Sequence, residues 1–213
     1  MTRVTLEQGS LTDGHELVLI NASNTNAQLG SGVSGAIRQA CGPKFQGQVL
    51  EALKAKFGGP MEPGQVLMTH AGAHPRAKHV AHVAVMDYRQ GFGPQSMPTL
   101  DTIRTCCERL WSELERLGSN VTVAMVAMGA GTGNLGVVDP TRITAETLKQ
   151  HLRAVTNSRL ERVTFYGYLP HEYAAMAKVL LPIFPEVEAG LSAEVRGFIG
   201  RDSSAVRSRS TPA

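Results

Sequence analysis

Residues 121–136 read VTVAMVAMGAGTGNLG, an apolar run that opens directly into a glycine-rich loop. Residues 16–37, ELVLINASNTNAQLGSGVSGAI, repeat this arrangement with a short apolar run, a polar loop with several glycines and the start of a helical pattern. Short continuous apolar runs are typical of strands buried on both faces. The two stretches therefore predict an α/β fold with ligand-binding loops at the carboxyl ends of its strands.

Strand-like and helix-like segments alternate along the rest of the chain. Strand patterns cover residues 65–69, 79–85 and 162–168. Helical patterns cover residues 34–57, with a break near Gly42-Pro43, residues 100–117 and residues 171–181. Asp139 and Pro140 are typical of the N-cap and first turn of a further helix. This alternation predicts a three-layer α/β/α sandwich around a mostly parallel sheet.

The composition is that of a soluble globular chain of 213 residues, with 42% hydrophobic residues, 18% charged residues and a formal net charge of +3. No apolar run reaches the ~18 residues that a membrane helix needs. Residues 1–10 lack the apolar segment of a signal peptide, so we expect a cytoplasmic protein without a membrane partner. The basic residues are scattered, which disfavours nucleic acid. We expect a monomer with one domain over residues 1–189 and a flexible, Ser- and Arg-rich tail over residues 190–213.

Neither the cysteines nor the histidines predict a metal centre or a disulfide framework. The chain has three cysteines without CxxC spacing: Cys41, Cys106 and Cys107. Four histidines lie close together in the sequence: His70, His74, His79 and His82. No cysteine or acidic cluster accompanies these histidines. We therefore expect His82 to be a hydrogen-bonded core residue, Cys106 and Cys107 to pack in a helix, and the protein to use no cofactor.

The first glycine-rich loop is suited to an anion. Glycines let a backbone approach a ligand closely, and N–H groups at the start of a helix attract phosphate. Asn21, Asn24 and Asn26 stand at or just past the end of the strand, where amides can recognise ribose hydroxyls. The glycines come too late for a GxGxxG fingerprint, and no GKS or GKT of a P-loop follows. A plain strand-to-helix turn is the alternative interpretation.

These residues resemble the macrodomain family. LINASNTNAQLGSGVSGAIRQACG looks like that family's strand, Asn-Ala-Ala-Asn and Gly-Gly-Gly-Val loop and following helix. GQVLMTHAGAHPRAKHVAHVAV, VAMVAMGAGTGNLG and RVTFYGYLPHEYAAMAKVL resemble the family's later segments in the expected order. The resemblance covers roughly residues 3–184. It implies a central mixed, six-stranded sheet between helices, with ADP-ribose or an ADP-ribosylated protein held in a surface cleft.

The resemblance also assigns site residues by position. Asn24 would contact the distal ribose and would be the catalytic residue if the protein is an enzyme. Tyr168 would stack on adenine, with a buried strand-end residue as the alternative. The full set implied to bind the ligand is Asn21, Ala22, Asn24, Gly30, Ser31, Gly32, Val33, Ser34, Gly131, Thr132, Gly133, Asn134, Leu135, Gly136 and Tyr168.

Three positions depart from the family's pattern. Residues 9–11 read GSL, so Ser10 stands where many members bind the adenine amino group with an aspartate, and Asp13 is a conceivable replacement. Ser34 stands where many hydrolytic members carry an aspartate, and a serine cannot act as a carboxylate base. Leu135 stands where an aromatic is often found.

The sequence leaves three functions open. The protein could hydrolyse mono-ADP-ribosyl esters or related ADP-ribose derivatives, with turnover depending on Asn24. It could instead be a non-catalytic reader of ADP-ribose. It could also hold another nucleotide, because the missing aspartate at Ser10 relaxes the choice of base.

Overall fold

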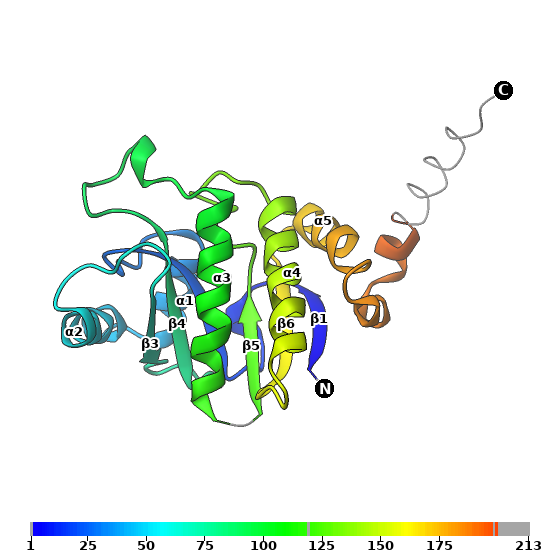
Figure 1. Ribbon diagram of the computed structural model, residues 1–213, viewed down its shortest axis with the longest axis horizontal. Coiled ribbons are helices and arrows are strands. Elements are labelled where there is room, and N and C mark those ends of the chain that lie inside the picture. The colour runs from blue at the N-terminus through cyan, green and yellow to red at the C-terminus, as the bar shows by residue number, and fades with distance from the viewer. Residues whose placement is uncertain (1, 119, 198, 200–213) are drawn as a thin grey trace.

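The computed structural model describes residues 2–118, 120–197 and 199, which form a six-stranded sheet with helices on both faces (Figure 1). The strands are β1 (Arg3–Gln8), β2 (Val18–Asn24), β3 (Val66–His70), β4 (His79–Met86), β5 (Val121–Met125) and β6 (Leu160–Gly167). Their order across the sheet is β1-β6-β5-β2-β4-β3. β3 runs antiparallel to β4, whereas the other pairings in the described chain are parallel. The predicted mixed, mostly parallel sheet is confirmed.

Two helical layers enclose the sheet. The helices are α1 (Gly32–Cys41), α2 (Phe45–Phe57), α3 (Leu100–Leu114), α4 (Val138–Ala154) and α5 (Pro170–Leu180). The core on one face joins α3, α4 and α5 to the sheet through residues such as Trp111 and Phe165. The core on the other face joins α1 and α2 to it through Ile37 and Phe45. The predicted three-layer α/β/α sandwich is therefore confirmed.

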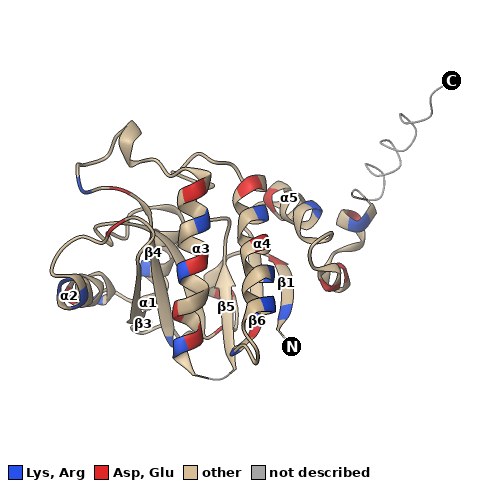
Figure 2. Cartoon of the chain, viewed as in Figure 1, with Lys and Arg blue, Asp and Glu red and all other residues tan. Residues whose placement is uncertain are grey.

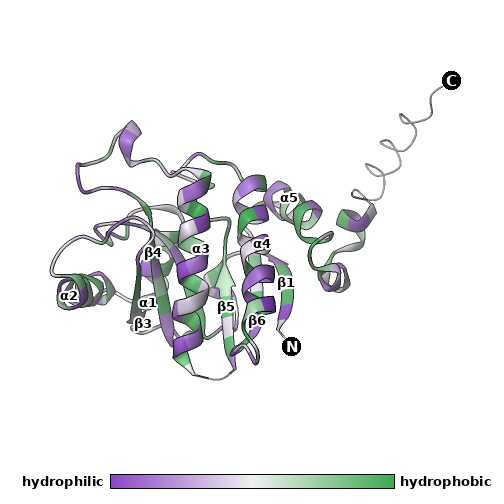
Figure 3. Cartoon of the chain, viewed as in Figure 1, coloured by the Kyte–Doolittle hydropathy of each residue, from purple (hydrophilic) through white to green (hydrophobic). Residues whose placement is uncertain are grey.

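The helices owe their positions to amphipathic sequences. In α3 the buried side chains Ile103, Cys107 and Leu110 recur at helical spacing. Hydrophilic and hydrophobic residues alternate along α3 and α4 in Figure 3, and charges of both signs mark their outer surfaces in Figure 2. Thr99 caps α3, since its side chain accepts a hydrogen bond from the Thr102 N–H. The apolar side of each helix faces the sheet, as the periodicity predicts.

The structure differs from the sequence predictions mainly at element ends. β2 continues to Asn24, so the first asparagines belong to the strand. β5 ends at Met125, three residues before the end of its apolar run. Val137 is the N-cap of α4, which places Asp139 inside the helix rather than at its cap. The helix predicted over residues 100–117 changes to a 3-10 turn after Leu114.

The predicted tail begins within packed structure. A 3-10 helix, η4 (Pro185–Gly190), packs beside β1, and Leu191 is buried in the core with α5. The packed unit therefore continues past residue 189. Most of the predicted tail, residues 200–213, lies outside the described residues. Across the part of the chain that is described, no helix has the length and apolar character to cross a membrane.

Candidate functional site

The two glycine-rich loops start from neighbouring strands. β2 and β5 pair in parallel, with Val18 beside Val123 and Leu19 beside Ala124. Their carboxyl ends therefore meet at one edge of the sheet, the upper edge in Figure 1. We call residues 24–34, from the end of β2 to the first turn of α1, loop 1 and residues 126–137 loop 2. Adjacent loops at the carboxyl ends of parallel strands are where open α/β sheets bind ligands.

Side chains hold loop 1 in shape. The Asn24 Oδ1 accepts hydrogen bonds from the N–H groups of Asn26 at 3.1 Å and Gln28 at 3.2 Å. The Asn24 Nδ2 donates to the Gln28 carbonyl at 2.9 Å. From α2, Gln46 accepts from the Leu29 N–H at 2.7 Å and donates to another carbonyl of the loop. Most of the hydrogen-bonding capacity of the Asn24 amide, the predicted catalytic group, is therefore used within its own loop. One N–H of the amide remains available to a ligand.

Helix α1 begins with unpaired donors. Ser31 is its N-cap, but the side chain makes no capping hydrogen bond. The Gly35 N–H returns to the Ser31 carbonyl at 3.2 Å, whereas the N–H groups of Gly32, Val33 and Ser34 have no partner among the described residues. Gly32 is exposed, and a Cβ there would meet nothing within 4 Å. Unpaired N–H groups at the positive end of a helix favour an anion at this position.

Glycine packing shapes loop 2. The Leu135 N–H donates to the Gly129 carbonyl at 3.1 Å, and the Asn134 N–H donates to the Gly131 carbonyl at 2.9 Å. A Cβ on Gly133 would lie 2.6 Å from the Gly129 carbonyl oxygen, so no larger side chain fits without a shift. Within the described chain, the loop 2 N–H groups without a partner include those of Gly131, Thr132, Gly133 and Gly136. Loop 2 therefore presents a second set of unpaired donors.

Neither loop carries a formal charge. Residues 21–35 and 126–138 contain no Asp, Glu, Lys or Arg. Gly30, Ser31, Thr132 and Asn134 are exposed, whereas Ala22 and Leu135 pack partly against the core. Any ligand at this edge would therefore be recognised by N–H groups, amides and hydroxyls. No carboxylate is positioned on either loop to act as a base.

Asn21 and Ser34 belong to a buried hydrogen-bond network below loop 1. The Ser34 hydroxyl donates to the Asn21 Oδ1 at 2.7 Å, and the Asn21 Nδ2 donates to the His82 Nδ1 at 3.1 Å. The His82 Nε2 lies 3.0 Å from the Thr69 Oγ1. The Asn21 amide thus lies beneath the surface that a ligand would meet. The network supports the first turn of α1 from below.

His82 is the neutral centre of this network. It is completely buried, and burial lowers the pKa of its imidazole to about 3. An amide nitrogen can only donate, so the Nδ1 that faces Asn21 is the acceptor and the Nε2 carries the proton. The predicted core role of His82 is confirmed.

Two tyrosines near the end of β6 have opposite environments. Tyr168 is 68% exposed, whereas Tyr166 is 7% exposed and donates to the Glu16 carboxylate at 3.0 Å. The alternative of Tyr168 as a buried strand-end residue is therefore wrong. Ser10 caps a 3-10 turn after β1, and Asp13 in that turn is exposed. Ser10 and Asp13 follow β1 and Tyr168 follows β6, and both strands end at the same edge as loops 1 and 2.

The loop after β4 adds an aromatic pair that the sequence analysis missed. The rings of Tyr88 and Phe92 meet edge to face at a centroid distance of 5.7 Å, and Phe92 is 66% exposed. The Tyr88 N–H donates to the Thr25 Oγ1 at 2.8 Å, and Asn26 donates to the Tyr88 carbonyl at 3.2 Å. The pair is therefore fastened to loop 1. Its only sequence signal is two aromatics within the polar stretch DYRQGF.

Most of the other titratable residues singled out from the sequence lie outside loops 1 and 2. Cys106 and Cys107 are buried in the core, as predicted, and burial raises the pKa values of their thiols to about 12 and about 11. The His74 Nδ1 accepts hydrogen bonds from two backbone N–H groups. The rings of His70 and His79 lie 6.3 Å apart. Among the described residues, no group of three His, Cys, Asp or Glu side chains is placed to hold a metal ion.

Comparison with known proteins agrees with this geometry. The model of the family described as Macro domain matches residues 20–144, a stretch that includes both loops. The chain belongs to the macrodomain family. A macro domain-containing protein from Streptomyces nogalater is 29% identical over 183 residues, which cover 84% of this macrodomain and 93% of that protein.

Two further relatives carry names or ligands that describe their own chemistry. A Cronobacter turicensis protein named O-acetyl-ADP-ribose deacetylase is 30% identical over 152 residues, which cover 70% of this chain and 81% of that protein. A Trypanosoma brucei macrodomain, solved in complex with ADP-ribose, superposes with a TM-score of 0.67. It is 22% identical, with coverage of 83% of this chain and 68% of that one, and therefore shares the fold.

Proposed function

We propose that this macrodomain binds ADP-ribose, free or attached to a protein, across loops 1 and 2. The observation that carries the proposal is the pair of uncharged loops that present unpaired N–H groups from adjacent strands. The diphosphate of ADP-ribose would accept hydrogen bonds from Gly32 to Ser34 on one side and from Gly131 to Gly133 on the other. The ADP-ribose complex of the Trypanosoma brucei relative supports this choice of ligand.

The two ends of the ligand would be held differently. The remaining N–H of Asn24 would meet the distal ribose. The exposed ring of Tyr168 would stack on the base. The Ser10 hydroxyl bonds to Thr12 within its own turn, so we expect stacking on Tyr168 to contribute more to adenine binding than Ser10 does.

Binding without turnover is the principal role that we propose. Neither loop supplies a carboxylate, and the Ser34 hydroxyl already donates to Asn21. Hydrolysis of an ADP-ribosyl ester is the second candidate, supported by the name of the Cronobacter turicensis relative. In that case water would be activated by the substrate's own phosphate rather than by a protein base.

Calorimetric titration with ADP-ribose, AMP and NAD tests the proposal. Gly32→Glu would place a carboxylate at the diphosphate position and should weaken ADP-ribose binding roughly 100-fold, about 2.7 kcal/mol. Gly32→Gln is the matched control, because it has the same strain at φ +57° and the same size without the charge. Equal losses in both variants, or tighter binding of AMP than of ADP-ribose, would contradict the proposal.

A second assay separates reader from hydrolase. A mono-ADP-ribosylated protein and O-acetyl-ADP-ribose are each incubated with the macrodomain, and release of ADP-ribose is followed by chromatography. We expect the protein to retain its label while ADP-ribose binding remains measurable. Release that Asn24→Ala abolishes would establish the second candidate instead.

A further inference from the structure

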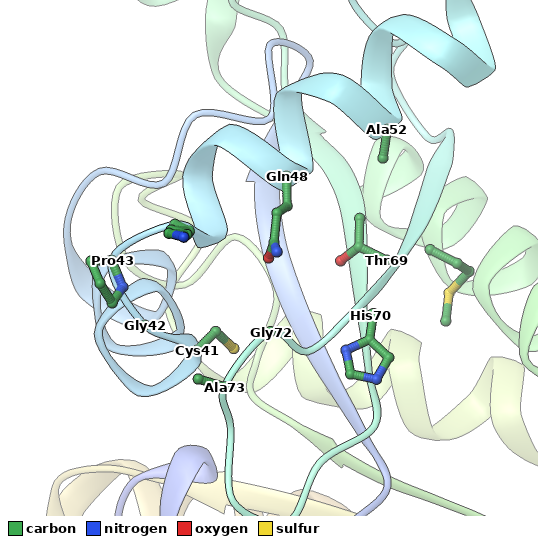
Figure 4. Close-up of a pocket in the computed structure, with 11 residues that line it drawn as sticks. Cys41, Gly42, Pro43, Gln48, Ala52, Thr69, His70, Gly72 and Ala73 are labelled. Atoms are coloured by element: carbon green, nitrogen blue, oxygen red, sulfur yellow. The ribbon is translucent and has the colours of Figure 1, made fainter.

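A pocket of about 720 Å³ lies at the opposite end of α1 from loop 1. It is bounded by the end of α1 at Cys41, the first turns of α2, strand β3 and the turn after β3 (Figure 4). α1 has 10 residues, so its two ends are about 15 Å apart. The pocket is therefore separate from the proposed ADP-ribose site. Its volume is that of a small-molecule site, roughly 300–1,000 Å³.

The lining of the pocket is rich in hydrogen-bond donors. Lys44, Gln48, Thr69 and His70 line it, and none of the described lining residues is Asp or Glu. Figure 4 shows Gln48 and Thr69 pointing toward the same space. Apolar surface on the same side comes from Cys41, Ala52 and Ala73. A donor-rich wall beside an apolar one is suited to a small molecule with an anionic end and a hydrocarbon body.

Thr69 supplies the most specific donor. Its side chain is 9% exposed, and its Oγ1 lies 3.0 Å from the His82 Nε2. The His82 Nδ1 accepts a hydrogen bond from the Asn21 Nδ2, so the Nε2–H donates and the Thr69 oxygen accepts. The hydroxyl proton of Thr69 is thus not used by His82. No acceptor for it is found among the residues that the structure describes.

We propose that this pocket binds a small organic carboxylate, which accepts a hydrogen bond from the Thr69 hydroxyl and is attracted by Lys44. The hydrocarbon part of the ligand lies against the apolar surface of Cys41, Ala52 and Ala73. Cys41 contributes packing surface, because burial raises the pKa of its thiol to about 12 and keeps it protonated. A carboxylate can accept hydrogen bonds from the donors of the lining, and its charge is opposite to that of the lysine there.

The hydrogen-bond network links the pocket to the proposed ADP-ribose site. From Thr69 it runs through His82 and Asn21 to Ser34, in the first turn of α1. A carboxylate that binds the Thr69 proton polarises the whole chain of donors. Binding in the pocket should therefore alter the amide resonances of Ser34 as well as those of β3.

Titration of the full chain with benzoate, followed by amide NMR, tests the site directly. We expect saturable shifts at Thr69, His70 and Gly72 with a dissociation constant in the low millimolar range, a binding free energy of about −3 to −4 kcal/mol. Benzamide and benzylamine are the neutral and cationic comparators. Benzylamine binding as tightly as benzoate, or benzoate shifts confined to loops 1 and 2, would overturn the proposal. So would the absence of shifts at about 50 mM benzoate.

Paired variants identify the groups that bind. Lys44→Met and Thr69→Val should each weaken benzoate roughly tenfold, because a hydrogen bond or charge contact to an anion is lost. Lys54→Met, on the same helix outside the lining, and Thr69→Ser, which keeps the hydroxyl, should stay within about twofold. Equal losses in Lys44→Met and Lys54→Met would reduce the effect to general charge and overturn the site.

The direction of the network has its own test. Long-range proton–nitrogen spectra report which nitrogen of the His82 ring carries the proton. We expect the Nε2–H form in the protein without ligand. An Nδ1–H imidazole would mean that the Thr69 hydroxyl donates its hydrogen bond to the His82 Nε2. The donor on which the proposal depends would then be absent.

Discussion

Loops 1 and 2 present the same kind of donor but are built in different ways. Besides backbone hydrogen bonds at Thr25 and Ala27, loop 1 is held by side chains, namely the amides of Asn24 and Gln46. Loop 2 is held by backbone hydrogen bonds and by the close approach of Gly133 to Gly129. A side-chain support can be removed one hydrogen bond at a time, whereas a glycine contact fails as soon as a methyl group is added. The two loops should therefore respond differently to substitution.

The largest effect is expected in loop 2. Gly133→Ala would put a methyl group 2.6 Å from the Gly129 carbonyl oxygen and 2.9 Å from a carbon of Pro98. Two of the crowded atoms belong to the backbone of Gly129, so the loop must move. We expect a loss of about 2–3 kcal/mol in the free energy of unfolding, measured with urea.

Gly131→Ala is the control for this prediction. A Cβ at Gly131 meets nothing within 4 Å, and this glycine is not among those with positive φ. The variant should keep its stability within about 0.5 kcal/mol. A Gly133→Ala protein as stable as Gly131→Ala would show that loop 2 is as adaptable as loop 1.

Acid should affect loop 1 before loop 2, because His82 lies beneath loop 1. The pKa of His82 falls from 6.5 to about 3 on folding, so the unfolded chain binds more protons between these values. Stability from this group is complete above pH 6.5 and is lost as the pH falls toward 3. At pH 5 the loss should be about 2 kcal/mol, at about 1.4 kcal/mol per pH unit.

Hydrogen exchange at pH 7 and pH 5 distinguishes the loops. We expect the Gln28 and Leu29 amides of loop 1 to lose more protection than the Leu135 amide of loop 2. His82→Gln cannot titrate and should remove most of the pH dependence of unfolding. An unchanged slope in that variant would assign the acid sensitivity to other groups.

Local sequence patterns predicted the position of loop 1 but not the hydrogen bonds beneath it that hold it in place. Apolar runs that end in glycines located both loops, and an asparagine in a turn is known to bond its own backbone, as Asn24 does. The Asn21–His82 bond joins residues 61 positions apart, and no local pattern records such a pairing. The Gly133 contact is equally invisible, because it depends on the path of the folded backbone.

Two further features depend on contacts between elements and not on a local pattern. The pattern of β1 does not by itself predict a strand, because four of the six residues in RVTLEQ are charged or polar and the segment pairs with the distant β6. The second cluster of donors around Thr69 likewise arises where α1, α2 and β3 meet. Sequence periodicity describes one element at a time, whereas these features exist only between elements.

Within loop 1, Asn24 should matter more than Asn26. Asn24→Ala removes three hydrogen bonds, and Asn26→Ala removes the side-chain bond to the Tyr88 carbonyl. We expect losses of about 1.5–2 kcal/mol and about 0.5–1 kcal/mol, because each exposed bond contributes a fraction of a typical one. Urea unfolding measures both. ADP-ribose affinity should fall with Asn24→Ala even if no turnover exists, since the loop that orders α1 is released.

A smaller effect than that of Asn24→Ala is expected from Gln46, which touches loop 1 only from outside. Gln46→Ala removes the acceptor of the Leu29 N–H and one donor to the loop, a loss of about 1 kcal/mol. We expect ADP-ribose affinity to fall about threefold while exchange in loop 2 stays unchanged. Gln48→Ala, on the same helix, should leave ADP-ribose affinity unchanged and weaken benzoate instead. If each variant weakened only its own ligand, α2 would support two separate sites through neighbouring glutamines. If both variants weakened both ligands, loop 1 and the pocket would form a single cooperative unit. The difference in construction between loop 1 and loop 2 would then apply to the whole α1–α2 layer.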